Sequence, residues 1–189
     1  MVDLIRRKLR AGAIFRFDVL RAFRRRDDGA AAVEFAFVLA PFLAVLFAIM
    51  ETAMVFFAGQ ALETAVADSS RLILTGQAQN GGLTPDTFKN AVCARIYGLF
   101  DCEKVTVDVQ KYTFFVDADL SRPVDEDGNV KPGGYNPGGP CEIVVVRLIY
   151  AYPVYLSMMG FDLADMSGNK RLLVATSVFR NEPYQGTCS

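Results

Sequence analysis

The chain has 189 residues, of which 52% are hydrophobic, with a formal net charge of −1 and neither His nor Trp. This length holds one domain and a membrane anchor rather than two large domains. Because His is the commonest general base and metal ligand, its absence disfavours an enzyme or a zinc site, and we expect neither catalysis nor a cofactor.

Basic residues are concentrated at the N-terminus. Residues 1–28 hold nine Lys and Arg against four Asp, and an apolar run begins soon after Arg24-Arg25-Arg26. A basic end beside an apolar span is the positive-inside pattern, which predicts a cytoplasmic leader and an exported C-terminal domain. A nucleic-acid-binding arm is the alternative. The adjoining apolar run disfavours it, and we expect no nucleic-acid partner.

The apolar run has the length of a membrane span. Residues 30–50 contain one charged residue, Glu34, and as a helix they extend about 31 Å, which matches the hydrocarbon core of a bilayer. Pro41 falls inside this run, where a transmembrane helix tolerates it as a kink. Glu51 is expected at the outer boundary as a cap or a pairing partner, and apolar residues continue to Ala58. We therefore predict a transmembrane helix over residues 30–58 in contact with lipid.

The helical pattern continues beyond this span. Apolar and small residues recur at i, i+3 and i+4 spacing, which predicts a helix with one buried stripe. The members of this stripe are Leu62, Ala65, Val66, Ser69, Leu72 and Ile73. A single long helix from about residue 30 to residue 75 follows, and Gly76 ends it.

The rest of the chain alternates between a short helix, strands and loops. Thr84-Pro85 predicts a helix start, with the helix running to about Gly98. The period then changes to two from Val105, predicting a strand that continues through Val116, and residues 141–150 and 171–180 are two more strand-like runs. Residues 156–167 are either a helix or a wide connection. Residues 121–140 form a long loop rich in Pro, Gly and acidic residues, interpreted as a functional or mobile excursion. The expected fold class is α+β, with a small antiparallel sheet packed on the helix.

All four cysteines follow the apolar segment. Their even number on the exported side predicts two disulfides in an oxidising compartment. Three pairings are open from the sequence, and we favour the one whose first bridge closes a short local loop. That pairing is Cys93–Cys102 with Cys141–Cys188.

The junction between the leader and the span carries the most specific pattern. Gly29 follows the basic leader, and Glu34 lies five residues later inside the apolar run. A carboxylate within a membrane span is costly and requires a partner. If the chain is cut after Gly29, Ala30 gains a free amine and Glu34 becomes the fifth residue, where it can pair with the terminal amine of a neighbouring subunit.

This pattern resembles the cleavage site of prepilins, with Phe35 at a position that is aromatic or apolar in many of them. More narrowly, the run from Gly29 to Gln79 is similar to the opening of the TadE-like pseudopilins of tight-adherence (Flp, type IVc) pilus systems. The segment Arg180-Asn181-Glu182-Pro183-Tyr184 is similar to the ending of that family, and the resemblance covers most of the chain from Gly29 to Tyr184, strongest at both ends. The leader of 29 residues is long for this class.

The resemblance implies a minor pilin-like subunit for the assembly or initiation of adhesive pili. Prepilin peptidase would cut after Gly29, and the partners would be other pilin and pseudopilin subunits and the pilus assembly platform. The location implied is the bacterial inner membrane, with the C-terminal domain in the periplasm or in the extracellular pilus. The expected parts are a leader (1–29), the transmembrane helix (30–58) and a pilin-like domain (59–189).

Two alternatives remain open. An uncleaved anchor could carry a periplasmic binding or sensor module whose loop at residues 121–140 meets a ligand. Ordinary signal-peptidase cleavage near Ala65-Val66-Ala67 is disfavoured, because charged Glu51 and Glu63 separate this site from the apolar run.

Overall fold

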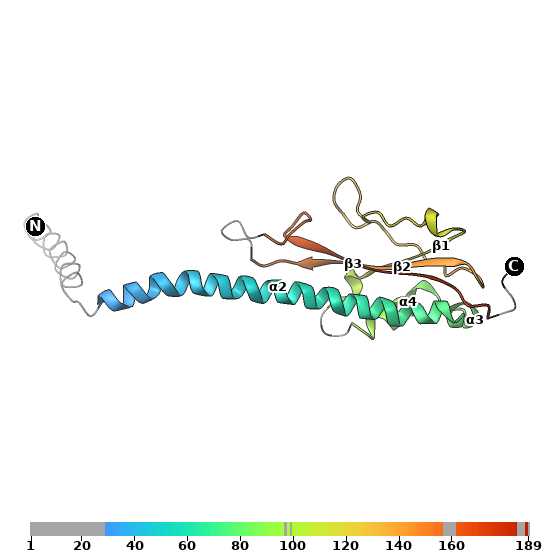
Figure 1. Cartoon of the computed structure of the whole chain (residues 1–189), viewed down its shortest axis with the longest axis horizontal. Coiled ribbons are helices and arrows are strands. Elements are labelled where there is room, and N and C mark those ends of the chain that lie inside the picture. The colour runs from blue at the N-terminus through green and yellow to red at the C-terminus, as the bar shows by residue number, and fades with distance from the viewer. Residues whose placement is uncertain (1–28, 97, 99, 157–161, 185–187, 189) are drawn as a thin grey trace, which may run out of the picture. The chain divides into compact units, whose positions relative to one another are not determined.

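The computed structural model describes residues 29–96, 98, 100–156, 162–184 and 188. The leader therefore lies outside the described residues, as does most of the first half of the connection at residues 156–167. Among the described residues, helix α2 runs from Ala30 to Leu74, and two short helices follow it, α3 (Gln77–Asn80) and α4 (Pro85–Cys93). The strands are β1 (Thr106–Tyr112), β2 (Ile143–Pro153) and β3 (Lys170–Arg180) (Figure 1). This content confirms the predicted α+β class.

Two compact units divide the chain, one ending at Phe47 and the other beginning at Ala48. The first described unit is an uninterrupted stretch of α2 that includes Pro41. The second holds the rest of α2, the two short helices and the sheet. α2 ends where predicted, because Gly76 adopts a positive φ of 75°, a conformation that Gly reaches without steric cost.

In the second unit, α2 contributes the predicted stripe to the core. Leu62 and Ile73 are completely buried there, and Phe88 joins them from α4. Each such side chain contributes about 1.5–3 kcal/mol by leaving water. Thr84 caps α4 by accepting a hydrogen bond from the N–H of Thr87 at 3.3 Å, as the Thr-Pro start predicted.

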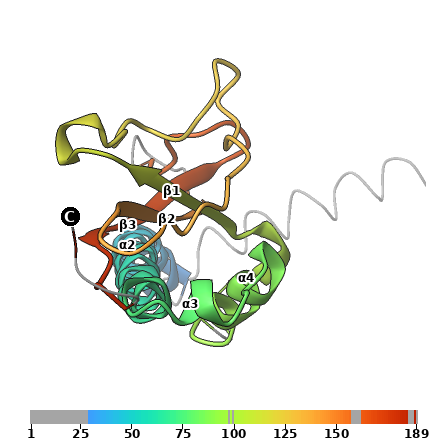
Figure 2. The same cartoon turned by 90° about the vertical axis from the view of Figure 1, so that its right-hand side faces the viewer.

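The sheet is antiparallel in the order β1-β2-β3. Central strand β2 is buried continuously from Ile143 to Tyr150, whereas edge strand β3 alternates between buried and exposed residues. Figure 2 shows the part of α2 from Ala48 onward on one side of the sheet, together with α3 and α4, and the loops around β1 on the other side. β2 is therefore covered on both faces, which explains its unbroken run of buried residues, all apolar except Arg147.

Two element boundaries differ from the prediction. The first strand stops at Tyr112, and residues 115–117 form a 3₁₀ turn instead of extending the strand. Tyr112 pairs with Ile143, the first residue of β2, so the residues after Tyr112 have no partner strand. α4 ends at Cys93 rather than near Gly98, and the disulfide from Cys93 to Cys102 turns the chain back toward the sheet.

The long loop has a structural role that its sequence did not reveal. The N–H of Val109 donates to Gly134 at 2.9 Å, and the N–H of Asn136 donates to Val109 at 2.8 Å. These bonds add residues 134–136 to the free edge of β1. The interpretation of this loop as a mobile excursion is therefore wrong for that part of it, which satisfies strand edge groups that water would otherwise solvate. In the connection at residues 156–167, the described residues contain no helix.

Candidate functional site: the N-terminal helix and its attachment

The first turns of α2 bring the predicted processing residues together. Gly29 directly precedes the helix, and Ala30, Glu34 and Phe35 lie on its first two turns. The side chain of Phe35 is 64% exposed, and Glu34 is exposed as well. Among the described residues, no hydrogen bond or ion pair to the Glu34 carboxylate is present. Within the described residues, Ala30, Glu34 and Phe35 are thus exposed on the helix surface, and Gly29 is partly exposed.

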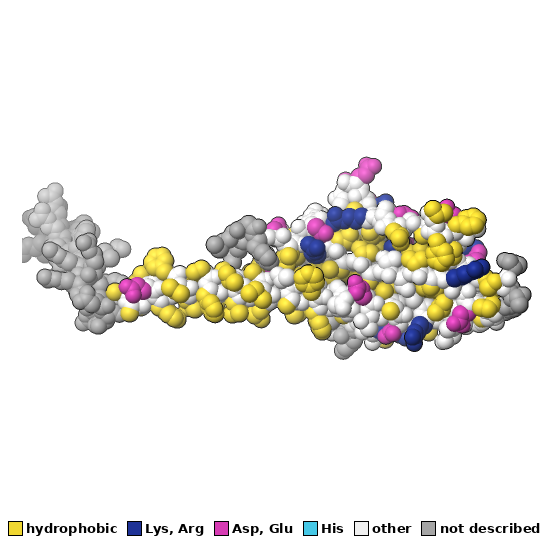
Figure 3. All heavy atoms as spheres, viewed as in Figure 1, with side chains coloured by type: hydrophobic (Ala, Val, Ile, Leu, Met, Phe, Trp, Pro, Cys, Tyr) yellow, Lys and Arg dark blue, Asp and Glu magenta, His cyan; other side chains and the backbone are white. Residues whose placement is uncertain are grey.

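The helix segment that follows is apolar on every side. Its most apolar 18-residue window has a mean hydropathy of 2.4, and none of that window is buried. Large exposed side chains include Phe37 at 77% and Val38 at 69%. Figure 3 shows hydrophobic side chains over the face of this part of α2 that it displays. A helix that is apolar all round requires lipid or another protein around it, so α2 qualifies by length and composition as one membrane span.

Glu51 attaches α2 to the sheet. Its carboxylate accepts hydrogen bonds from the backbone N–H groups of Tyr155 and Leu156, the latter at 3.1 Å. These residues follow the end of β2. The expected role of Glu51 as a cap or pairing partner is therefore fulfilled within the chain, where it satisfies two backbone donors. The sequence gives no signal for this contact, because more than 100 residues separate its partners.

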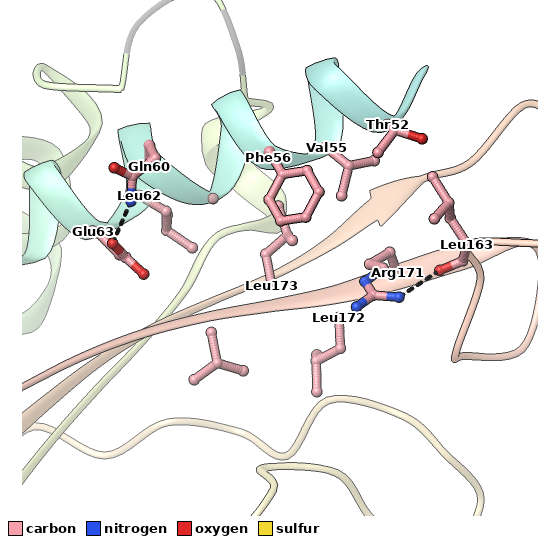
Figure 4. Close-up of a pocket in the computed structure, with 12 residues that line it drawn as sticks. Thr52, Val55, Phe56, Gln60, Leu62, Glu63, Leu163, Arg171, Leu172 and Leu173 are labelled. Carbon is pink, nitrogen blue, oxygen red and sulfur yellow. Dashed lines mark hydrogen bonds between the residues drawn. The ribbon is translucent and has the colours of Figure 1, made fainter. Parts of the chain in front are cut away.

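A hollow of about 360 Å³ lies between α2 and β3. In Figure 4, Phe56 and Leu62 of α2 face Leu173 of β3, and Leu163 closes one side. The polar groups at its rim are engaged. Gln60 donates to Glu63, and Arg171 donates to the carbonyl of Leu163 at 3.1 Å. The hollow is lined chiefly by apolar side chains and contains no nucleophile with an adjacent base.

A buried ion pair joins β1 and β2 on the other face of the sheet. Asp108 and Arg147 are directly opposite in the strand register, and their side chains are 8% and 11% exposed. Burial raises the pKa of the Asp108 carboxyl. Hydrogen bonds from Gly134, Gln110 and Arg147 outweigh burial, so its net pKa lies below the ordinary value. A lone Arg within the otherwise apolar run of β2 was the available signal for this pair.

Arg147 also holds the long loop. Its Nη1 donates to the carbonyls of Asp119 and Ser121 at 3.2 and 3.3 Å. Nearby, Arg122 is paired with Asp165 at 3.1 Å. The start of the loop is thus fixed over the sheet by charged side chains, and the pair serves to fasten this cover.

The two disulfides are Cys93–Cys102 and Cys141–Cys188, with Cα–Cα distances of 5.7 and 5.6 Å. This is the pairing favoured from the sequence. Over the described residues, no group of three or more His, Cys, Asp or Glu side chains is arranged to hold a metal ion. The candidate site described here is thus the surface of the N-terminal helix together with the contacts that attach it to the domain.

The comparison with protein families finds a match over the N-terminal helix. Residues 29–71 match the family model of TadE-like protein. The match begins at the glycine of the processing motif and ends inside α2, so it covers the whole unpartnered surface. The resemblance predicted from the sequence is confirmed over this TadE-like segment, which is less than a quarter of the chain. No curated protein and no solved structure matches the chain.

Over residues 29–71 the chain is thus similar to a family that is associated with the tight-adherence pilus. A single apolar N-terminal helix agrees with a membrane anchor. The similarity of residues 180–184 to the ending of the family lies outside the matched residues and stays a prediction.

Proposed function

We propose that this protein is a minor pilin-like subunit, a pseudopilin, that acts in the assembly or initiation of tight-adherence pili. The observation that carries the proposal is the coincidence of three features in one segment. The TadE-like match, the unburied apolar helix surface and the Gly29-to-Glu34 spacing all occupy residues 29–71.

Prepilin peptidase is the proposed processing enzyme, with its cut between Gly29 and Ala30. The new amine of Ala30 would carry a positive charge at the start of an apolar helix. The surroundings of Glu34 support pairing between this amine and the Glu34 carboxylate of another subunit. A carboxylate in a membrane span is costly without a partner, and none is present among the described residues of its own chain. One subunit's Glu34 would then bind the amine of the next and set the register between them.

The apolar surface at residues 35–58 is the proposed contact with membrane lipid before assembly and with neighbouring subunits after it. Small residues among the large ones, such as Ala40, Ala44 and Ala48, allow close approach between helices. The assembly platform would move the subunit from one environment to the other. The proposed orientation has a cytoplasmic N-terminus, and two disulfides support an oxidising compartment for the domain.

The test is the N-terminal residue and intact mass of the full chain extracted from membranes with active or inactivated prepilin peptidase. A start at Ala30 that depends on the active enzyme is the expected result. Gly29→Val should block the cut. Gly59→Val is its matched control, since an added Cβ meets nothing within 4 Å at either glycine. A start at Met1 or Val2 with active enzyme would contradict the proposal.

That second outcome would favour the alternative, an uncleaved anchor with a binding or sensor module. The structure offers this alternative little support at residues 121–140. The loop is fastened to β1 and to Arg147 by the hydrogen bonds described above, and a role in covering the sheet accounts for them.

A further inference from the structure

At one end of the sheet, where β2 ends and β3 begins, tyrosines lie beside cations. Tyr152 pairs with Arg171 in the strand register, and Pro153 pairs with Lys170. Tyr155 follows, with 79% of its surface exposed. Two tyrosines and two cations therefore lie at one end of the second unit. We name these four residues, Tyr152, Tyr155, Lys170 and Arg171, the tyrosine–cation end.

Glu51 fixes the height of this end along the helix. Its carboxylate binds the backbone N–H groups of Tyr155 and Leu156. In the sequence, Glu51 is the first residue after the 21 residues that match the thickness of the hydrocarbon core. The hydrogen bonds consequently hold Tyr155 beside the helix turn of Glu51, the residue predicted at the outer boundary of the hydrocarbon core, where the headgroup region begins.

The chemistry of these side chains fits that region. Tyrosine has an apolar ring and a polar hydroxyl and is enriched at membrane–water interfaces. Lysine and arginine place their aliphatic stems along apolar surface while their charged heads reach lipid phosphates. The same turns of α2 also expose Met54, Phe56 and Phe57, at 47%, 73% and 59%. Pairing with two amides lowers the cost of a carboxylate this close to hydrocarbon.

We propose that the tyrosine–cation end rests on the headgroup region of the outer leaflet while α2 spans the membrane, with a lipid bilayer as its partner. This inference rests on the proposed anchoring of the TadE-like segment. Lipid is favoured over a second protein because the tyrosine–cation end is bound to Glu51, which directly follows the apolar span. A bilayer that surrounds residues 30–50 therefore already borders Glu51. The contact gives the domain a fixed orientation on the membrane before assembly.

Tryptophan fluorescence tests this contact, because the natural chain contains no Trp. Three single variants of the full chain are placed in phosphatidylcholine–phosphatidylglycerol vesicles with lipids brominated at shallow or deep positions. Tyr155→Trp reports on the proposed contact, and Phe42→Trp on the proposed span. Phe115→Trp is the matched control. All three sites are well exposed, at 79%, 61% and 59%, so folding is little affected.

The control lies at the far end of the sheet. Phe115 follows β1, whose last residue, Tyr112, pairs with the first residue of the 11-residue strand β2, whereas Tyr155 follows the last residue of that strand. At about 3.3 Å per residue, β2 separates the two ends by roughly 35 Å, much more than the depth of a headgroup layer.

We expect shallow bromines to quench Tyr155→Trp several-fold more than Phe115→Trp, and deep bromines to quench Phe42→Trp. Strong quenching of Phe42→Trp with equal, weak quenching of the other two would overturn the inference and leave the anchor intact. No quenching of Phe42→Trp would overturn the anchor and the inference together. Emission of Tyr155→Trp that depends on protein concentration but not on bromine would assign this end to a second copy and also overturn the lipid contact.

A second variant tests the role of Glu51. Glu51→Ala in the Tyr155→Trp chain should reduce shallow quenching, because the two backbone N–H groups lose their acceptor. Glu63→Ala is its control, since Glu63 also lies on α2 but receives its hydrogen bond from Gln60 of the same helix. Equal loss of quenching in both variants would contradict a specific role for Glu51.

Discussion

Arg147 donates two hydrogen bonds to a single carboxylate oxygen of Asp108, from Nε at 3.0 Å and from Nη2 at 2.6 Å. The two residues are opposite each other in the register of β1 and β2. The remaining Nη1 of Arg147 binds backbone carbonyls of the covering loop. One buried cation therefore joins two strands and the segment that shields them.

Removal of Arg147 should destabilise the domain strongly. Arg147→Met leaves the Asp108 carboxylate buried without its cation, which costs about 3–5 kcal/mol. In a unit of this size, the unfolding midpoint of detergent-solubilised protein should fall by roughly 10 °C in circular dichroism. The double variant Asp108→Leu/Arg147→Met should recover most of this loss.

The control is Lys111→Met, which breaks the ion pair between Lys111 and Glu142. The side chains of that pair are 46% and 40% exposed, so its loss should cost under about 1 kcal/mol. Equal losses in both single variants would contradict this account.

Acid should weaken the domain through the same carboxyl. Because the folded pKa of Asp108 lies below its unfolded value, its contribution is complete above the unfolded pKa, about 3.9, and is lost as the pH falls through the folded pKa. The unfolding midpoint should thus decline as the pH falls below about 5 and continue to decline until the folded-state carboxyl is protonated.

Asp108→Asn should flatten this decline without abolishing it. The N–H of Gly139 and the Lys111 ammonium also lower the pKa of Glu142, which contributes with the same sign. Unfolding curves of both proteins at several pH values check the slope, and identical slopes would exclude Asp108 as a source.

Gly76 should resist substitution for two separable reasons. Its φ is +75°, and an added Cβ would lie 2.3 Å from Cγ of Tyr184. Gly76→Ala should therefore cost about 1 kcal/mol or more from backbone strain, plus the cost of displacing the tyrosine ring. Gly82→Ala isolates the first contribution, since Gly82 has a φ of +59° with nothing within 4 Å of the added Cβ. Thermal unfolding should rank Gly76→Ala well below Gly82→Ala; equal midpoints would mean that the ring moves freely.

Glu34 should matter for assembly more than for processing. In Glu34→Ala the cut after Gly29 should proceed, whereas recovery of assembled filaments should fall by roughly tenfold or more, the factor that 1.4 kcal/mol of lost pairing produces. Mass spectrometry of the N-terminus and counts of pili by electron microscopy measure the two effects separately. Glu63→Ala, another exposed carboxylate on α2, is the control. Normal piliation by Glu34→Ala would remove its role in subunit register.

The features that the sequence predicted well depend on local chemistry. Gly76 ends α2, Thr84 and Pro85 begin α4, and β-branched runs become β2 and β3, because each signal lies within a few residues of its effect. The local pattern also predicted, wrongly, that the first strand continues through Val116. Its neighbours have strand propensity, but strand pairing ends where β2 begins at Ile143.

The contacts that were not predicted join distant parts of the chain. Arg147 and Asp108 are 39 residues apart, and Glu51 binds N–H groups more than 100 residues away. Both contacts depend on a register that only the folded sheet defines. The proposed processing motif at Gly29 and Glu34, in contrast, could be predicted from the sequence, because it depends only on local spacing.

The core of the second unit cannot be completed until the last strand, β3, has been synthesised. Ile73 of α2 packs in one cluster with Ala175 of β3, about 100 residues later in the chain. At 5–20 residues per second, synthesis of that interval takes on the order of 5 to 20 s. During this delay the stripe of α2 lacks its complete sheet, and β2 lacks β3, the strand that completes its pairing. The nascent chain therefore passes through a stage in which part of its apolar core is exposed, and this is when protection by a chaperone would matter most.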